Sequence, residues 1–112
     1  MHELGLAKDL ASIIFNTMQK EGKDKKLKKV VIVIGQASGI EKDFLNHSLK
    51  DHIFKGTEFE NVEIEYKIQK VEIKCKSCEK IFTQPVIKCD CGNLNFDIKS
   101  GKDVFIEKIE VE

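Results

Sequence analysis

The 112-residue sequence has no net charge, because its 19 basic and 19 acidic side chains cancel. Nonspecific binding to nucleic acids or to anionic membranes needs an excess of positive charge, so neither is expected as a partner. No apolar run approaches the roughly 20 residues that span a membrane, and the first residues lack the charged-then-apolar order of a signal peptide. These absences predict a cytoplasmic protein.

Tryptophan is also absent, and aromatic residues make up only 7% of the sequence. Hydrophobic residues at 41% and charged residues at 34% nevertheless give the balance of a folded protein. The length allows one domain, or two small units that share a core. The sequence offers no Ser/His/Asp arrangement from which a catalytic cleft could be built, so the chain is not predicted to be an enzyme.

The apolar pattern of the first half predicts two helices and a strand. Apolar residues at steps of three and four predict an amphipathic helix over about residues 4–20. A β-branched run at 30–34 predicts a strand that is buried on both faces. Ser38 and Glu41 have the spacing of a capping box, and the helix that they introduce is predicted to stop at Gly56.

Alternating apolar and polar residues predict strands in the second half, at 62–68 and, after the cysteines, at about 96–98 and 104–111. The alternation slips once in the last strand, which a β-bulge would explain. That strand must return to the core, because alone it has nothing to bury against. The lysine-rich segment 20–29 is predicted to be a solvated loop rather than a phosphate-binding patch.

The four cysteines form two closely spaced pairs, and a reducing compartment favours metal ligands or redox thiols over disulfides. Cys75 and Cys78 form a CxxC motif, and after ten residues Cys89 and Cys91 form a CxC motif. Four thiolates satisfy the tetrahedral preference of zinc. Such sites can contribute about 10–16 kcal/mol of apparent binding free energy to a segment that is too small for its own core. We therefore predict a structural zinc site.

Two alternatives to this interpretation remain open. Cys75 and Cys78 could carry out thiol redox chemistry, although that chemistry favours a strand-to-helix setting and the flanking residues here have strand character. Asp90, between the second pair, could replace one ligand, although carboxylate oxygen is a poorer match for a thiolate-rich site.

The first three residues offer a second candidate metal site. The free amine of Met1, the backbone amide of His2 and Nδ1 of its imidazole can form two fused chelate rings, and nitrogen donors in a plane suit Ni(II) and Cu(II). Glu3 can add its backbone amide or its carboxylate. Position alone does not establish this site, because terminal residues are usually solvated and tolerant of change.

His47 and His52 are the two remaining histidines. In an α-helix, residues five positions apart project about 140° from each other around the axis. The two imidazoles are therefore predicted not to share a face, as metal ligands would, and we interpret them as histidines of the surface or of the core edge.

The order of the elements predicts an α+β fold in which two helices pack on a three-stranded sheet. Residues 1–70 and 101–112 are expected to form this α+β domain. Residues 71–100 are expected to form an inserted four-cysteine zinc-ribbon domain.

The start "MHE", the segment "VVIVIGQASGI" and the paired cysteines late in the chain resemble the HypA/HybF family of hydrogenase maturation proteins over the whole length of the sequence. The resemblance implies a nickel metallochaperone that binds Ni(II) through residues 1–3. It also implies that the four cysteines hold a structural zinc ion and that the protein helps to insert nickel into nickel–iron hydrogenase. The family usually has CxxC in both cysteine pairs, so the CxC motif is a departure.

The resemblance also implies partners. They are a HypB-like GTPase and the precursor of the hydrogenase large subunit, with urease maturation proteins and a second copy of the chain in a homodimer as further candidates. The alternative function is a zinc-ribbon module that binds nucleic acid or another protein. A nucleic-acid-binding module should show basic and aromatic residues clustered on one surface.

Overall fold

The computed structural model describes residues 3–22, 24–84 and 86–112. Its helical segments are α1 (Glu3–Glu21), α2 (Lys42–His47) and the π-helical segment η1 (Ser48–Ile53), which continues α2 without a break. Its strands are β1 (Leu27–Gly35), β2 (Glu63–Gln69), β3 (Glu72–Cys75), β4 (Ile81–Phe82), β5 (Phe96–Ser100) and β6 (Val104–Val111). The strands form two sheets, in the orders β2-β1-β6 and β4-β3-β5, which confirms the predicted α+β class.

The first sheet is built around β1, which runs parallel to β2 and antiparallel to β6. A parallel pair needs a crossover connection, which α2 and η1 provide here. The last strand returns to this sheet after the chain has passed through the second one, as predicted. The register of β6 shifts between the partners of Val31 and Ile32, which leaves Glu107 as the extra residue and confirms the predicted bulge.

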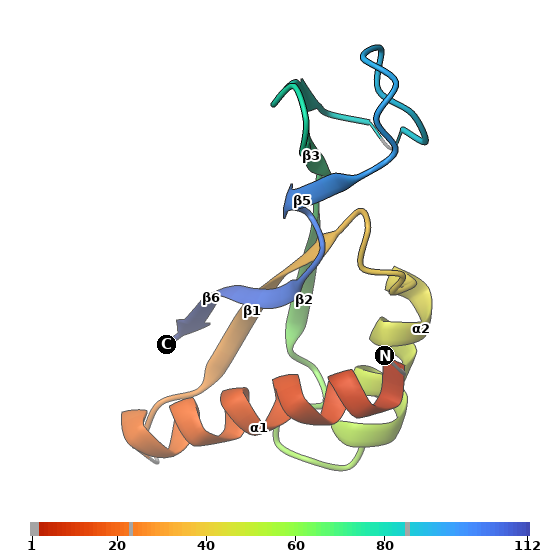
Figure 1. The fold of residues 1–112 in the computed structure, drawn as a ribbon. Coiled ribbons are helices and arrows are strands. Elements are labelled where there is room, and N and C mark those ends of the chain that lie inside the picture. Colours follow the sequence, from red (N-terminus) through yellow and green to blue (C-terminus); the bar gives the residue numbers. More distant parts are fainter. Residues whose placement is uncertain (1–2, 23, 85) are drawn as a thin grey trace.

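One face of the first sheet packs against the helices, with α1 running across it (Figure 1). The buried residues of α1 recur at the steps of three and four that its sequence predicts. Complete burial of one aliphatic or aromatic side chain contributes about 1.5–3 kcal/mol. The core therefore lies between this sheet and the helices. Among the described residues, its buried members are Leu6, Ala7, Leu10, Ala11, Ile14, Met18, Val30, Ile32, Ile34, Leu45, Leu49, Phe54, Phe59 and Val62.

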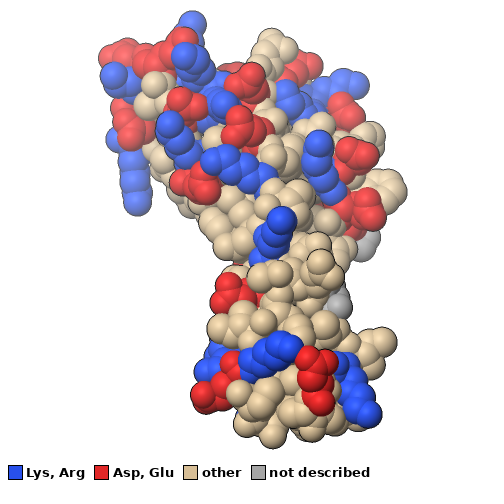
Figure 2. All heavy atoms as spheres, turned by 90° about the horizontal axis from the view of Figure 1, so that it is seen from above, with Lys and Arg blue, Asp and Glu red and all other residues tan. Residues whose placement is uncertain are grey.

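The opposite face of β1 is buried beneath charged side chains. Val31 and Val33 are each only 4% exposed, and their partners in β2 are Glu65 and Lys67. Lys67 also pairs with Glu107 of β6 at 2.8 Å, across β1. Long charged side chains lay their methylene groups on apolar surface while the charges stay in water. The predicted burial of both faces is thus confirmed, and Figure 2 shows charges of both signs interspersed over the larger part of the molecule.

The second helix differs from its prediction at both ends. It begins one residue after Glu41, which occupies the cap position without a side-chain hydrogen bond. Ser38 Oγ instead accepts a hydrogen bond from the backbone N–H of Ile40 at 3.2 Å. The predicted capping box is therefore wrong, because the serine closes a local turn ahead of the helix. The helical segment ends at Ile53, before Gly56, whose φ is +79°.

The lysine-rich segment was predicted to be a loop up to residue 29, but β1 begins at Leu27. Lys29 belongs to the strand, and its Nζ lies 3.0 Å from Glu65 Oε1 of β2. The prediction is wrong for residues 27–29 because Lys28 and Lys29 lie within the strand, where the long charged side chain of Lys29 is partly buried and reaches β2.

The two sheets meet at a narrow junction that the chain crosses twice. The backbone N–H of Gly35 donates to the carbonyl of Asp103 at 2.8 Å, and that of Ala37 donates to the carbonyl of Gly101 at 2.7 Å. A Cβ added to Gly101, whose φ is +83°, would lie 2.7 Å from the carbonyl oxygen of Lys70. Glycine permits both the conformation and the close approach. The molecule is elongated, 58 × 23 × 17 Å, and Figure 2 shows a waist between its larger and smaller parts.

Candidate metal centre

The first two cysteines lie in a tight turn between β3 and β4. Cys75 is the last residue of β3, and Cys78 follows in the turn. The backbone N–H of Glu79, whose φ is +65°, donates to the carbonyl of Cys75 at 3.0 Å. The backbone N–H of Cys75 donates to the carbonyl of Lys80 at 2.9 Å. These bonds turn the chain back on itself and bring the two thiols to the same side.

The second pair lies in a turn of similar design in the segment before β5. The backbone N–H of Cys89 donates to the carbonyl of Asn93, and that of Gly92 donates to the carbonyl of Cys89, each at 2.9 Å. Gly92 has a φ of +94°, which favours glycine. Asn93 Nδ2 also donates to Cys75 Sγ at 3.3 Å and so links the two turns. This role of Asn93 is not predicted from the sequence, where its only signal is its place two residues after the last cysteine.

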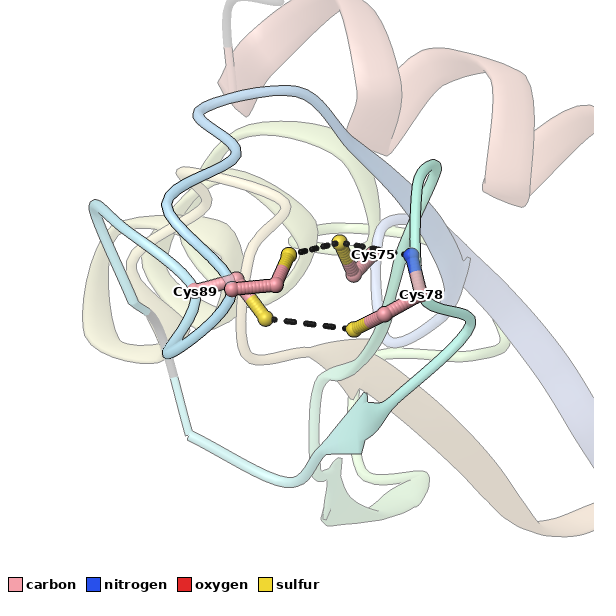
Figure 3. Close-up of side chains that lie close together, drawn as sticks. Cys75, Cys78 and Cys89 are labelled. Carbon is pink, nitrogen blue, oxygen red and sulfur yellow. Dashed lines mark hydrogen bonds between the residues drawn. The ribbon is translucent and has the colours of Figure 1, made fainter.

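The four sulfur atoms converge on one point (Figure 3). The Sγ atoms of Cys75 and Cys91 are 3.7 Å apart, and those of Cys78 and Cys89 are 3.4 Å apart. All four lie within 4.8 Å of one another. Zinc–sulfur bonds of about 2.3 Å in a tetrahedron place the sulfurs about 3.8 Å apart. The cluster, including its CxC pair, therefore fits a zinc ion.

Electrostatics of the cluster also favour a bound cation. The backbone N–H of Cys78 donates to Cys75 Sγ and lowers the pKa of Cys75 to about 6, against the effect of burial and with a further contribution from Asn93. At Cys89, the backbone N–H of Cys91 lowers the pKa, but burial and the three neighbouring thiols outweigh it and raise the pKa to about 12. Thiols this close hinder one another's ionisation, and a divalent ion removes that repulsion.

Neither alternative for the cysteines finds support in the surroundings. Asp90 Oδ2 lies 2.6 Å from Lys80 Nζ, and this ion pair lowers the pKa of Asp90. Within the residues that the structure describes, the convergent group consists of the four cysteines without Asp90. The turn that holds Cys75 and Cys78 connects two strands, β3 and β4, and not the strand and helix that a redox motif favours.

Of the predicted nickel ligands, Glu3 is the only one within the described residues. It is the first residue of α1 and is partly buried. A carboxylate in the first turn of a helix is stabilised by the positive end of the helix dipole. Met1 and His2 lie outside the described residues, so the N-terminal nickel site stays a prediction.

His47 and His52 lie side by side, so their predicted separation is wrong. Their Nε2 atoms are 3.1 Å apart, and the rings pack edge to face with centroids 4.8 Å apart. The physical reason is the π-helical turn, in which the backbone N–H of Phe54 donates to the carbonyl of Leu49, five residues earlier, at 2.8 Å. A π-turn holds one residue more than an α-turn, so side chains five apart become neighbours.

Comparisons with known proteins agree with this structure. The family model described as "Hydrogenase/urease nickel incorporation, metallochaperone, hypA" matches residues 1–111. Two relatives, from Caldanaerobacter subterraneus subsp. tengcongensis and from Aquifex aeolicus, are 35% and 34% identical to the chain. Both alignments cover 100% of this chain and respectively 100% and 98% of the relative, and each relative is named "Hydrogenase maturation factor HypA".

Solved structures show the same fold. The solution structure of the Ni metallochaperone HypA from Helicobacter pylori matches with a TM-score of 0.71 over 98% of this chain and 97% of that chain, at 22% identity. Within the described parts of the chain, every helix is too short or too polar to cross a membrane.

Proposed function

Because the chain belongs to the HypA family of hydrogenase and urease nickel-incorporation metallochaperones, we propose that it binds Ni(II) through its first residues and delivers the ion for maturation of a nickel–iron hydrogenase. The observation that carries the proposal is the family match over residues 1–111, which includes the N-terminal "MHE". The spacing of the four sulfurs supports zinc as the resident structural metal.

The proposed nickel ligands are the amine of Met1, the backbone amide and imidazole Nδ1 of His2, and Glu3. A free α-amine has an ordinary pKa of about 7.7–8.0, so a metal ion can displace its proton near neutral pH. Nitrogen donors in a plane suit Ni(II). A terminal site is also open to a partner protein, unlike a four-thiolate site whose positions are all filled. Such openness is what delivery of an ion requires.

We further propose that the two metals belong to two units. Residues 1–70 and 101–112 form the nickel-binding unit, and residues 71–100 form the inserted zinc-binding unit. The support is that the two sheets share no strand among the described residues and meet at the junction around Gly35 and Gly101. Zinc would fold the smaller unit through its four cysteines, while the larger unit folds around its own apolar core.

The partners that follow from this role are a HypB-like GTPase and the precursor of the hydrogenase large subunit in the cytoplasm. Urease maturation proteins and a second copy of the chain are further candidates. The role is an accessory one rather than catalysis. Nucleic-acid binding is not favoured, because lysines and acidic residues interleave on the face seen in Figure 2 instead of forming a basic surface.

Nickel affinity of the zinc-loaded chain tests the N-terminal site. The variant His2→Ala removes the imidazole, and two residues added before Met1 move the free amine away from His2. Both changes should abolish tight binding and the absorption of planar Ni(II), measured by calorimetry and spectroscopy. Lys8→Ala is the control, because it changes an exposed side chain of α1 that belongs to no proposed metal site, and it should leave the tight site intact. Unchanged planar binding in both N-terminal variants would refute the site.

Metal content after purification under native conditions tests the zinc assignment. We expect one zinc ion per chain in the unmodified protein and in Ser77→Ala, and loss of zinc in Cys78→Ala, which changes the same turn. Nickel titration of the zinc-depleted chain then measures how far the two sites are coupled. Retention of zinc by Cys78→Ala would contradict the four-thiolate site.

A further inference from the structure

The contact between His47 and His52 is fixed by the core. Leu49 and Phe54 lie five residues apart and are both fully buried. A regular α-helix would present position 53 to the core after Leu49, whereas the π-turn presents Phe54. Phe54 packs edge to face against Phe15 and Phe59, with ring centroids 5.9 Å and 6.0 Å away. Burial of Phe54 therefore stabilises the wide turn and, with it, the pairing of the two imidazoles on the outer face.

Asp51 orients the first of these imidazoles. The Nδ1–H of His47 donates to Asp51 Oδ2 at 2.7 Å. With its proton on Nδ1, His47 keeps a free lone pair on Nε2, and this atom faces Nε2 of His52. Histidines that bind metal ions commonly donate their other ring N–H to a carboxylate in this way. The arrangement thus contains both the ligand atoms and the group that holds one of them in position.

We propose that His47 and His52 form a second transition-metal site, which binds a divalent ion such as Ni(II) through both Nε2 atoms. Metal–nitrogen bonds of about 2.0–2.1 Å that meet at a right angle place two nitrogens about 3 Å apart. The observed separation is 3.1 Å. Imidazole nitrogen is a ligand that suits nickel, copper and zinc. The site uses neither Met1 nor His2, so it does not rest on the proposed N-terminal site.

The surroundings favour weak, exchangeable binding. The side chains of His47 and Asp51 are 58% and 60% exposed, and His52 is exposed as well. Water can therefore complete the coordination, and the ion can enter and leave without opening the fold. Helix α2 contacts α1, and Figure 1 shows it next to the beginning of that helix. The pair is thus carried by the helical layer and not by the cysteine-bearing sheet.

The competing interpretation is a simple hydrogen bond between the rings. With the proton of His47 on Nδ1, the Nε2–H of His52 can donate to Nε2 of His47. That interpretation requires no metal affinity beyond that of a single surface histidine. A metal site requires the two rings to act together.

Nickel titration of the zinc-loaded His2→Ala chain distinguishes these interpretations, because only two of the three histidines then remain. Paramagnetic Ni(II) broadens the NMR signals of its ligand rings, and we expect both rings to broaden at the same nickel concentration. His47→Gln and His52→Gln, each added to this chain, should lower the affinity about a hundredfold, because the remaining imidazole loses its chelating partner.

Asp51→Asn keeps both imidazoles and tests the orienting carboxylate. It should lower the nickel affinity about 10–100-fold, whereas Asp24→Asn, an exposed carboxylate in the loop after α1, should change nothing. Far-ultraviolet circular dichroism verifies that each variant is folded. Independent broadening of the two rings, unchanged affinity in either glutamine variant, or no broadening at millimolar nickel would overturn the inference. The N-terminal proposal would survive all three results, since the parent chain lacks His2.

Discussion

The two sheets have three strands each, but they bury very different amounts of apolar surface. The sheet β2-β1-β6 is covered by helices on one face and contributes to a continuous core. The sheet β4-β3-β5 and its connecting segment leave large apolar side chains in water, with Ile87 89% and Leu94 64% exposed. Its described buried residues are few and include Cys75 and Cys89. Burial of apolar side chains stabilises the larger part, whereas the smaller part has four convergent cysteines in place of an apolar core, so we expect its fold to depend on a bound metal ion.

Loss of the metal should give the largest difference between the two parts. Chelation of zinc, or Cys75→Ala, should unfold residues 72–100, because about 10–16 kcal/mol of apparent binding free energy is lost. The larger part should keep its fold, since its core contains none of the cysteines. Amide hydrogen exchange by NMR measures both parts at once. Loss of protection in β1 together with β3 would show that the two parts do not fold separately.

A cavity in the apolar core should have the opposite effect. Phe54 is fully buried and packs against Phe15 and Phe59, and Phe54→Ala should lower the free energy of unfolding of the larger part by about 3–5 kcal/mol. Zinc content should be unchanged. Denaturant unfolding and metal analysis provide the two measurements, and Phe44→Ala, which truncates an exposed phenylalanine of α2, is the matched control. A loss of zinc in Phe54→Ala would contradict the separation of the two parts.

The junction should respond to a single methyl group. In Gly101→Ala the new Cβ would lie 2.7 Å from the carbonyl oxygen of Lys70, at a φ of +83°, so backbone strain and displacement should cost about 1–3 kcal/mol. Gly39→Ala is the control, because Gly39 has a similar φ of +76° but nothing within 4 Å of the added atom. Thermal unfolding should show a larger loss for Gly101→Ala. Equal losses in the two variants would mean that the close approach contributes nothing.

The smallest effect on stability should come from the charged side chains on the face of the first sheet that is opposite the helices. A hydrogen bond from Lys29 lowers the pKa of Glu65 below its ordinary 4.5. A lowered carboxyl pKa stabilises the folded state above that ordinary value, and the stabilisation disappears as the pH falls through the folded-state pKa. Lys29→Met should raise the pKa of Glu65 and flatten the acid side of the stability curve slightly, since exposed ion pairs contribute little. NMR titration measures the pKa, and Lys28→Met, an exposed neighbour, should leave it unchanged.

Most of the fold could be predicted because its main signals are periodic. The α1 stripe, the β-branched run of β1 and the slip in β6 each follow from side-chain geometry within one element. The spacing of the cysteines likewise predicts convergence of their sulfurs without knowledge of the rest of the chain. Such predictions succeed because they need only local geometry.

Predictions that assumed a regular local geometry were wrong where the core overrode it. Burial of Phe54 in the core widens the last turns of the second helix to a π-helical geometry. This brings His47 and His52 together, although a 3.6-residue repeat would separate them. The spacing of Ser38 and Glu41 matches a capping box, but Ser38 Oγ accepts a hydrogen bond from the backbone N–H of Ile40 in the turn before the helix. The contribution of Asn93 to the sulfur cluster also depends on how two turns face each other, which no single segment encodes.

Lys70 and Gly101 lie almost in contact, so the chain leaves the larger part and rejoins it at one place. Because the two ends of residues 71–100 are adjacent, this segment should tolerate removal, lengthening or replacement by a two-residue turn without displacement of β2 and β6. The same junction should allow the thirty residues 71–100 to be inserted into another protein, at any place in a sheet where two backbone ends lie at a similar separation. We therefore expect residues 71–100 to be exchangeable between proteins as one insert.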